Sequence, residues 1–235
     1  DAFQGSPHTA RILFIYTVFI VYAELHCLTH YSFLRGASAP EELVGRAANS
    51  GYHALAITDE CSLAGVVKAH VAAKERGLKL IVGSEFTLTE GIRLIALVPS
   101  REAYGELSGL ISRTRRRSGK GEYRVHLRDV IFHLKRCLLI LLPDDTDNQT
   151  VHLQQLARRC KGRVWIGISR LLGNDEWRRF KHRYHMAQNL QVPMVACGEV
   201  QMHSAKRKAL HDVLTAIRLQ TPVQQLGHRR LINSQ

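Results

Sequence analysis

Seven short apolar runs that alternate with helical segments constrain the fold of this chain more than any other feature. We expect strands at residues 22–25, 54–58, 78–88, 92–98, 137–143, 163–169 and 192–197. Helices are predicted between them, over residues 38–51 and 62–77, from about 101, near 149–160, near 174–190 and over 204–219. Strands that alternate with helices are typical of a parallel sheet, and seven of them suit a closed or nearly closed barrel.

Local signals mark several boundaries of these elements. Ser38 and Glu41 stand at capping-box spacing with Pro40 between them, which predicts a helix start. Ser62 is the predicted N-cap of the next helix. Residues 89–91, Thr-Glu-Gly, predict a hairpin turn between the third and fourth strands.

The composition indicates a folded chain without a membrane-spanning segment. A chain of 235 residues with 45% hydrophobic content can bury a full core, as one large or two small domains. The apolar segment at residues 12–23 is shorter than the roughly 20 residues of a spanning helix, and no signal-peptide cleavage site follows it. We expect it to be a buried first strand with an upstream extension. The five cysteines form no CxxC pair, which argues against a zinc ribbon and suits a reducing cytoplasm.

The net charge of +13 is concentrated in two segments. Residues 113–136 carry nine lysines and arginines against two acids, and residues 158–183 carry the same excess. A basic excess confined to patches favours a polyanionic partner such as nucleic acid, whereas the alternative is a pair of solvated helix faces. The DNA-binding candidates are Arg113, Arg115, Arg116, Arg117 and Lys120.

Acids and histidines follow several predicted strands at the barrel end where α/β proteins gather their sites. His26 follows the first strand, Asp59 and Glu60 the second and Glu199 the last, while Glu85 stands on the third. Imidazole and carboxylate groups on one rim would suit a divalent metal. As alternatives, Asp59 would cap a helix and Glu85 would face solvent. Loops near this rim are predicted to hold His126, His133 and His203.

Three separated motifs resemble one family. The segments "YAELHCLTHYSFLRGAS", "ALAITDECSLAGVVKAHVAAKERGLKLIVGSEF" and "VPMVACGEVQMHSAKRKALHDVLTAIRLQTP" resemble the N-terminal PHP (polymerase and histidinol phosphatase) domain of bacterial C-family DNA polymerases. They are most similar to the error-prone, damage-inducible group related to the polymerase III alpha subunit. The resemblance implies a distorted (β/α)7-like barrel over residues 22–221. Residues 1–21 would then be a non-matching extension, and residues 222–235 the start of a connector to a polymerase body.

The resemblance also implies that the metal site is eroded. PHP domains use an H-x-H turn, a T-D-H, a G-x-E, a later histidine and a final D-x-H. In this chain His26, Asp59 and Glu85 match these motifs. The other positions hold Leu28, Glu60, Arg93, Glu199 and Gln201, of which only the two glutamates offer an anionic oxygen. The implied ligand set is therefore vestigial, with weak binding of zinc, manganese or magnesium at most.

Three functions follow as hypotheses. The first is a structural, DNA-proximal domain of an error-prone polymerase that serves DNA replication and repair by damage-induced translesion synthesis. Its partners would be DNA, the palm and thumb of its own polymerase, a sliding clamp and mutagenesis accessory proteins, and magnesium would serve the polymerase body. The alternative is an active, metal-dependent PHP phosphoesterase or 3′→5′ exonuclease, which needs closely held ions. The third is an unrelated nucleic-acid-binding protein.

Overall fold

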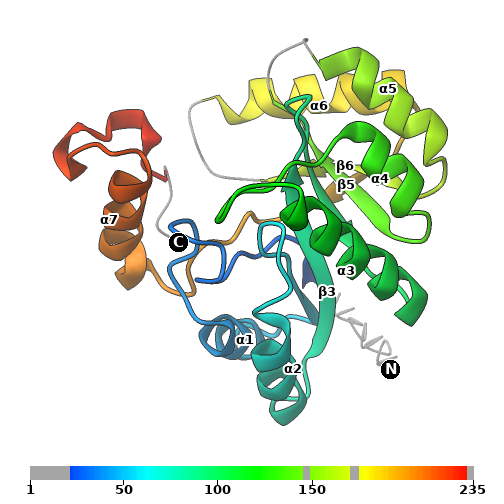
Figure 1. The fold of residues 1–235 in the computed structure, drawn as a ribbon. Helices are drawn as coiled ribbons and strands as arrows, with labels where there is room; N and C mark the ends of the chain where they lie inside the picture. The colour runs from blue at the N-terminus through cyan, green and yellow to red at the C-terminus, as the bar shows by residue number, and fades with distance from the viewer. Residues whose placement is uncertain (1–21, 145–148, 170–174, 232–235) are drawn as a thin grey trace, which may run out of the picture.

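A computed structural model describes residues 22–144, 149–169 and 175–231, and its seven strands form one sheet in chain order (Figure 1). Every neighbouring pair is parallel except β3 with β4 and β4 with β5, which are antiparallel. The strands are β1 (Ala23–Glu24), β2 (Ala54–Ile57), β3 (Lys79–Thr87), β4 (Arg93–Leu97), β5 (Leu138–Leu142), β6 (Val164–Ile168) and β7 (Met194–Ala196).

The sheet closes almost completely into a barrel, which confirms the predicted fold class. The segments after β1 and β7 pair, because Leu28 N donates to Val200 O and Val200 N donates to His26 O, both at 2.9 Å. Buried Glu24 ties the same seam by accepting from Gly198 N at 2.7 Å. Small and aliphatic side chains fill the interior, among them Ala56, Ile95, Leu97, Ile140, Leu142 and Cys197.

The hairpin between β3 and β4 is present, and it makes β4 run against its neighbours. Leu88 N donates to Ile92 O at 2.8 Å, and Gly91 takes a φ of 82°. A tight turn can join only antiparallel strands, since a parallel connection needs a crossover of a dozen or more residues. The expectation of a parallel sheet is therefore wrong for β4. The reversal places Arg93, its first residue, at the end of the barrel where the parallel strands finish.

Helices cover the outside of the barrel in two groups (Figure 1). The first two helices pack with β2 and β3 in one hydrophobic cluster, and the next four cover β3–β6 in a larger one. The last helix stands to one side of the barrel (Figure 1). The helices are α1 (Pro40–Asn49), α2 (Val66–Glu75), α3 (Arg101–Arg116), α4 (Leu127–His133), α5 (Thr150–Arg159), α6 (Glu176–Leu190) and α7 (Lys208–Arg218).

Some local predictions are wrong. The first capping box joins Ala39 to Glu42, since Ala39 N donates to Glu42 Oε2 at 2.8 Å, and α1 begins at Pro40 rather than at Ser38. Helix α2 begins at Val66, after a turn, and not at Ser62. Helix α4 was not predicted, and His133 lies in it rather than in a loop.

None of the helices in the described part of the chain is long and apolar enough to cross a membrane. The apolar segment at residues 12–21 lies outside the described residues. All five cysteines are buried and free of disulfide bonds.

Candidate functional site

The candidate site is centred on Glu85, a carboxylate with no solvent exposure on β3. Its main-chain N–H donates to Thr58 O at 3.1 Å, so β3 is held beside the segment that follows β2. His26, equally buried, places its Nε2 2.6 Å from Glu85 Oε2. The alternative in which Glu85 faces solvent is therefore wrong.

Arg35 occupies the space between two of these acids. Its Nη1 lies 2.8 Å from Glu85 Oε1 and 2.7 Å from Glu60 Oε2, and its side chain is 16% exposed. The other carboxylate oxygen of Glu60 accepts from the Tyr123 hydroxyl at 2.7 Å. Arg35 comes from the loop between β1 and α1, and sequence reasoning missed it. The only signal was a cation inside the family-like segment "YSFLRGAS".

Arg93, the first residue of β4, also contacts Glu85. Its Nε lies 3.4 Å from Glu85 Oε1, and its Nη2 donates to Glu199 Oε1 at 2.8 Å. This contact depends on the reversal of β4, which brings residue 93 to the rim. Two guanidinium groups therefore bridge three glutamates, and we call Arg35, Arg93, Glu60, Glu85 and Glu199 the arginine cluster.

The electrostatics of the arginine cluster favour the charged forms. Burial alone would raise the pKa of Glu85, but the contacts with His26, Arg35 and Arg93 hold that pKa well below its usual range. Glu199 behaves similarly: burial would raise its pKa, but Arg93 and His26 together lower it. Burial opposes the charge on both arginines, yet the surrounding glutamates raise their pKa values.

Asp59 has a different role, although it is buried near the same rim. Its carboxylate accepts from Thr29 N and Thr29 Oγ1, both at 2.8 Å, and from Ser32 Oγ at 2.7 Å. Burial raises its pKa, and these hydrogen bonds counteract only part of the rise. Asp59 therefore fixes the β1–α1 loop rather than capping α2.

The side chains present do not fit a metal ion. The oxygens of Glu85 and Asp59 already accept from protein donors, and the arginines supply positive charge where a cation would bind. Leu28, which stands where the family has a second histidine, is fully buried and offers no donor atom. Gln201 Oε1 accepts a hydrogen bond from His211 Nε2 at 2.7 Å. Among the described residues, no three His, Cys, Asp or Glu side chains are arranged to hold one ion.

The remaining histidines named from the sequence lie in other interactions. His126 Nδ1 is 2.7 Å from Thr89 Oγ1, at the start of α4. His203 Nδ1 is 2.8 Å from Ser38 Oγ, beside α1. Neither contact includes a residue of the arginine cluster.

The basic residues at the end of α3 divide into two kinds. Arg115 donates to the carbonyl oxygens of Glu60 and Cys61 at 3.3 Å and lies over the ring of Tyr123, so it supports the loop after β2. Arg117 pairs with Asp129 at 2.7 Å. Arg113, Arg116 and Lys120 are exposed, as is Arg117. Because Arg117 is already paired with Asp129, the exposed candidates that remain for DNA contact are Arg113, Arg116 and Lys120.

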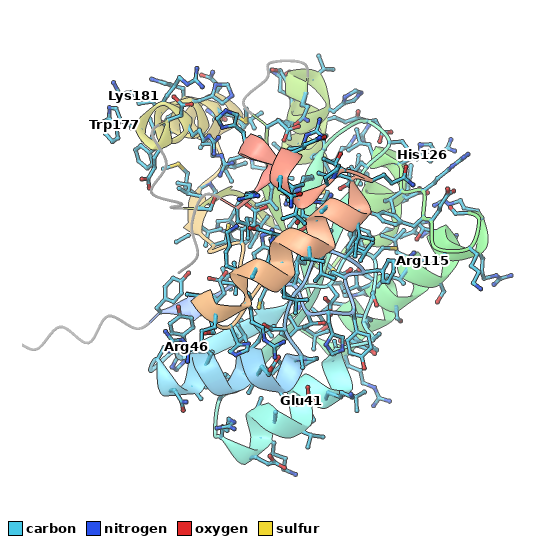
Figure 2. All side chains as sticks on the ribbon, turned by 90° about the vertical axis from the view of Figure 1, so that its left-hand side faces the viewer. Glu41, Arg46, Arg115, His126, Trp177 and Lys181 are labelled. Carbon is cyan, nitrogen blue, oxygen red and sulfur yellow. The ribbon has the colours of Figure 1, made fainter. Side chains whose placement is uncertain are left out.

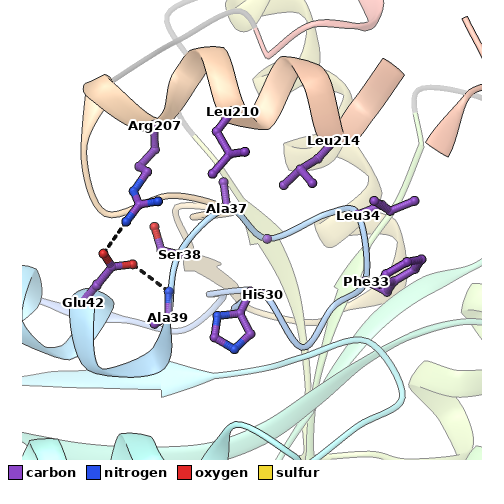
Figure 3. Close-up of a pocket in the computed structure, with 11 residues that line it drawn as sticks. His30, Phe33, Leu34, Ala37, Ser38, Ala39, Glu42, Arg207, Leu210 and Leu214 are labelled. Atoms are coloured by element: carbon purple, nitrogen blue, oxygen red, sulfur yellow. Dashed lines mark hydrogen bonds and ion pairs between the residues drawn. The ribbon is translucent and has the colours of Figure 1, made fainter. Parts of the chain in front are cut away.

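A pocket of about 490 Å³ lies between the β1–α1 loop and α7 (Figure 3). Its walls are mostly apolar, with Phe33 and Leu34 on one side and Leu210 and Leu214 on the other. One end is closed by Glu42, which accepts from Ala39 N and pairs with Arg207 (Figure 3). The arginine cluster does not line this pocket.

Curated relatives of this chain are error-prone DNA polymerases. The chain is 54% identical over 215 residues to "Error-prone DNA polymerase" of Saccharophagus degradans, covering 91% of this chain and 21% of that protein. With the enzyme of Teredinibacter turnerae it shares 48% identity over 216 residues, covering 92% and 21%. The chain therefore spans about a fifth of the length of these relatives.

Solved structures and family membership agree with this fold. A candidate metal-dependent phosphoesterase from Bifidobacterium adolescentis superposes with a TM-score of 0.59 at 18% identity, over 77% of this chain and 88% of that one, which supports the fold alone. Residues 24–161 match the PHP domain family. Because that match covers more than half of the sequence, this chain belongs to the PHP domain family.

Proposed function

We propose that this chain is a non-hydrolytic PHP domain of an error-prone DNA polymerase. In this proposal the parent protein acts in the cytoplasm on DNA, in replication and in translesion synthesis after damage. Nucleotidyl transfer, with its magnesium ions, belongs to the polymerase body. The similarity to curated error-prone polymerases over 91% of this chain supports the proposal.

One observation carries the non-hydrolytic part of the proposal: Glu85 is fully occupied by protein groups. One oxygen lies 2.6 Å from His26, and the other lies 2.8 Å from Arg35 and 3.4 Å from Arg93. Metal-dependent hydrolysis needs ions that activate water and neutralise the leaving oxygen. An ion here would have to displace one arginine and tolerate the positive charge of the other.

The arginine cluster replaces the function of ions in holding the rim together. Each guanidinium bridges two glutamates that come from different parts of the barrel, after β2, on β3 and after β7. Cross-linking of this kind keeps the rim ordered without a bound metal. It therefore suits a domain whose contribution is structural.

The experiment is a digestion assay on labelled single-stranded DNA with magnesium, manganese or zinc. We expect no cleavage above background by the 235-residue chain. The control is Asp59→Asn, which removes a charge that any PHP hydrolase would need. Metal-dependent cleavage by the parent chain that disappears in this variant would establish the alternative, an active phosphoesterase or 3′→5′ exonuclease.

DNA contact by α3 is a further part of the proposal. Arg113, Arg116 and Lys120 are exposed, whereas Arg115 and Arg117 are engaged within the protein. Lysine and arginine contacts with phosphates release counterions and dominate the affinity of most DNA-binding surfaces. We therefore expect the three exposed cations to contact the phosphate backbone.

Partner domains are proposed on the same basis. Exposed apolar side chains on α7, Val213 and Ile217, lie beyond the pocket wall formed by Leu210 and Leu214. The curated relatives are about five times as long as the matched segment. We propose that the palm and thumb of the parent polymerase cover this side of the domain. A sliding clamp and mutagenesis accessory proteins are proposed from the family resemblance.

A further inference from the structure

We propose that α6 carries a stacking surface for single-stranded DNA, formed by Trp177, Phe180 and Tyr184 with Lys181 and Arg178. We call these five residues the α6 aromatic face. The inference rests on the proposed function in one respect, since it assumes that the domain works beside DNA. It adds a second binding surface, and it identifies the form of nucleic acid that the surface would take.

The three aromatic rings form a continuous row. The Trp177 and Phe180 centroids are 5.5 Å apart with planes inclined by 9°, and those of Phe180 and Tyr184 are 6.4 Å apart and inclined by 20°. Spacings of three and four residues place all three rings on one side of the helix. Because the rings stack on one another, the faces between them are shared, and a flexible strand would meet the row at its exposed ring edges and outer ends.

This row is not needed to attach α6 to the barrel. Ala187 is buried, and Met186 and Leu190 pack against the hydrophobic cluster. Arg183 adds two hydrogen bonds, to Gly167 O at 3.1 Å and Pro143 O at 3.5 Å. Trp177, in contrast, is 66% exposed and projects away from the fold (Figure 2).

Such high exposure is unusual for tryptophan, which has the largest apolar side chain. Tyr184, at the other end of the row, is 42% exposed, so the rings at both ends meet solvent while Phe180 lies between them. Contiguous exposed apolar surface marks an interaction site more often than scattered single residues do. The α6 aromatic face therefore indicates an interaction site, and the neighbouring charges indicate which kind of partner it fits.

The charges beside the rings are positive. The Lys181 ammonium lies 5.3 Å from the Trp177 ring centroid, over its face. Arg178 is 74% exposed, and its contact with Asp175, at 3.4 Å, is a weak surface pair. The surrounding segment, residues 158–183, has nine cations against two acids. This charge suits a polyanion better than the apolar surface of another protein domain.

A single strand fits this combination better than a duplex does. Proteins that bind single strands combine basic residues along the backbone with aromatic side chains on which bases stack. In a duplex the base faces are already stacked on one another and cannot reach the rings. The same surface would therefore discriminate between the two forms.

The test compares binding of a fluorescent 20-nucleotide oligothymidylate and a duplex of equal length to the 235-residue chain. A chelator is present, so that no metal site contributes. We expect Trp177→Ala combined with Tyr184→Ala to weaken single-strand binding by roughly tenfold to a hundredfold. Duplex binding should change by less than about twofold. Trp177→Phe should retain most of the affinity, because a phenyl ring still stacks.

Phe132→Ala is the matched control, since Phe132 on α4 is 67% exposed and lies outside the α6 aromatic face. Unchanged melting temperatures show that the variants remain folded. Equal single-strand affinity of the parent and the double variant would overturn the proposal and leave a protein partner as the occupant. An equal loss in Phe132→Ala would overturn it as well. Because a chelator is present, neither result bears on the hydrolysis assay above.

Discussion

Replacing Glu85 by glutamine removes the charge at the centre of the arginine cluster and leaves the side-chain shape nearly unchanged. Arg35 and Arg93 then each keep a single carboxylate, Glu60 and Glu199 respectively. His26 loses its charged acceptor at the same time. We therefore expect a large loss of stability from a change that creates no cavity.

The magnitude follows from burial. Glu85 is fully buried, and the side chains of Arg35 and Arg93 are only 16% and 28% exposed. Breaking a buried ion pair by removing one partner costs about 3–5 kcal/mol. Because each arginine keeps a second glutamate, we expect the lower end, about 3 kcal/mol. A chain of this size loses about 2–4 °C of melting temperature per kcal/mol, which gives a decrease of roughly 6–12 °C.

The assay is thermal unfolding at neutral pH, with Glu41→Gln as the matched control. Glu41 lies 4.0 Å from Lys68, and both side chains are about half exposed, at 46% and 55%. Such a surface pair contributes about 0–1 kcal/mol. If the melting temperatures of Glu85→Gln and Glu41→Gln fell by amounts that agree within about 2 °C, burial would not be what makes the ion pairs of the arginine cluster strong.

The difference in stability between the parent chain and Glu85→Gln should also depend on pH. The pKa of Glu85 is lower in the folded chain than in the unfolded chain, so its charge stabilises the fold above the ordinary glutamate pKa. That contribution is lost as the pH falls toward the lowered folded pKa. The stability difference between the parent and Glu85→Gln should therefore shrink steadily below about pH 4. A constant difference between pH 7 and pH 3 would contradict this assignment.

Three further changes give independent outcomes. Asp59→Ala leaves the buried Thr29 N–H without its acceptor, so its free energy of unfolding in urea should be about 1–3 kcal/mol lower than that of Asp59→Asn. Equal losses of stability in the two variants would contradict the role of Asp59 in fixing the loop. Arg116→Ala should remove about one phosphate contact with duplex DNA, which makes the log–log slope of affinity against salt concentration shallower by about 0.9. Arg117→Ala should instead mainly lower the melting temperature, because it breaks the pair with Asp129. Restoring the family ligands should permit manganese binding only when Arg35 is also replaced by alanine. Manganese binding with Arg35 in place would show that this side chain does not block an ion. The restoring changes are Leu28→His, Glu60→His, Arg93→His, Glu199→Asp and Gln201→His.

The fold was predictable because the strands are short, apolar and separated by clear helical segments. The hairpin at residues 89–91 was predictable from its turn residues, whereas the prediction of a parallel sheet is wrong for β4, which opposes its neighbours and brings Arg93 to the rim. Helix α4 was missed because it has only seven residues. Its start depends on the capping contact between His126 N and Asp129 Oδ2, at 2.8 Å.

The site was predictable only in part, for a physical reason. His26, Asp59 and Glu85 follow or end buried strands, so the topology alone sends them to one rim. Arg35 lies in a loop of irregular backbone, where no periodicity indicates which way a side chain points. Its pairing with Glu60 and Glu85 depends on how that loop folds back, and on the hydrogen bonds by which Asp59 holds Thr29 and Ser32.

Charge alone did not separate the arginines of α3. Arg113, Arg115, Arg116 and Arg117 are nearly consecutive, and in sequence they form a single patch. In the fold Arg115 turns toward Tyr123 and the loop after β2, while Arg113 and Arg116 face solvent. Helical rotation by about 100° per residue accounts for the division.

The central claim is that arginines occupy the place of metal ions in this PHP domain. The most direct measurement is equilibrium dialysis of the 235-residue chain against manganese and zinc, followed by quantification of bound metal in the parent and in Glu85→Gln. Ions held by exposed histidines would bind both proteins equally, so only the difference reports on the arginine cluster. We expect no difference in bound ions per chain. One or more ions per chain that bind the parent and are lost in Glu85→Gln would contradict it.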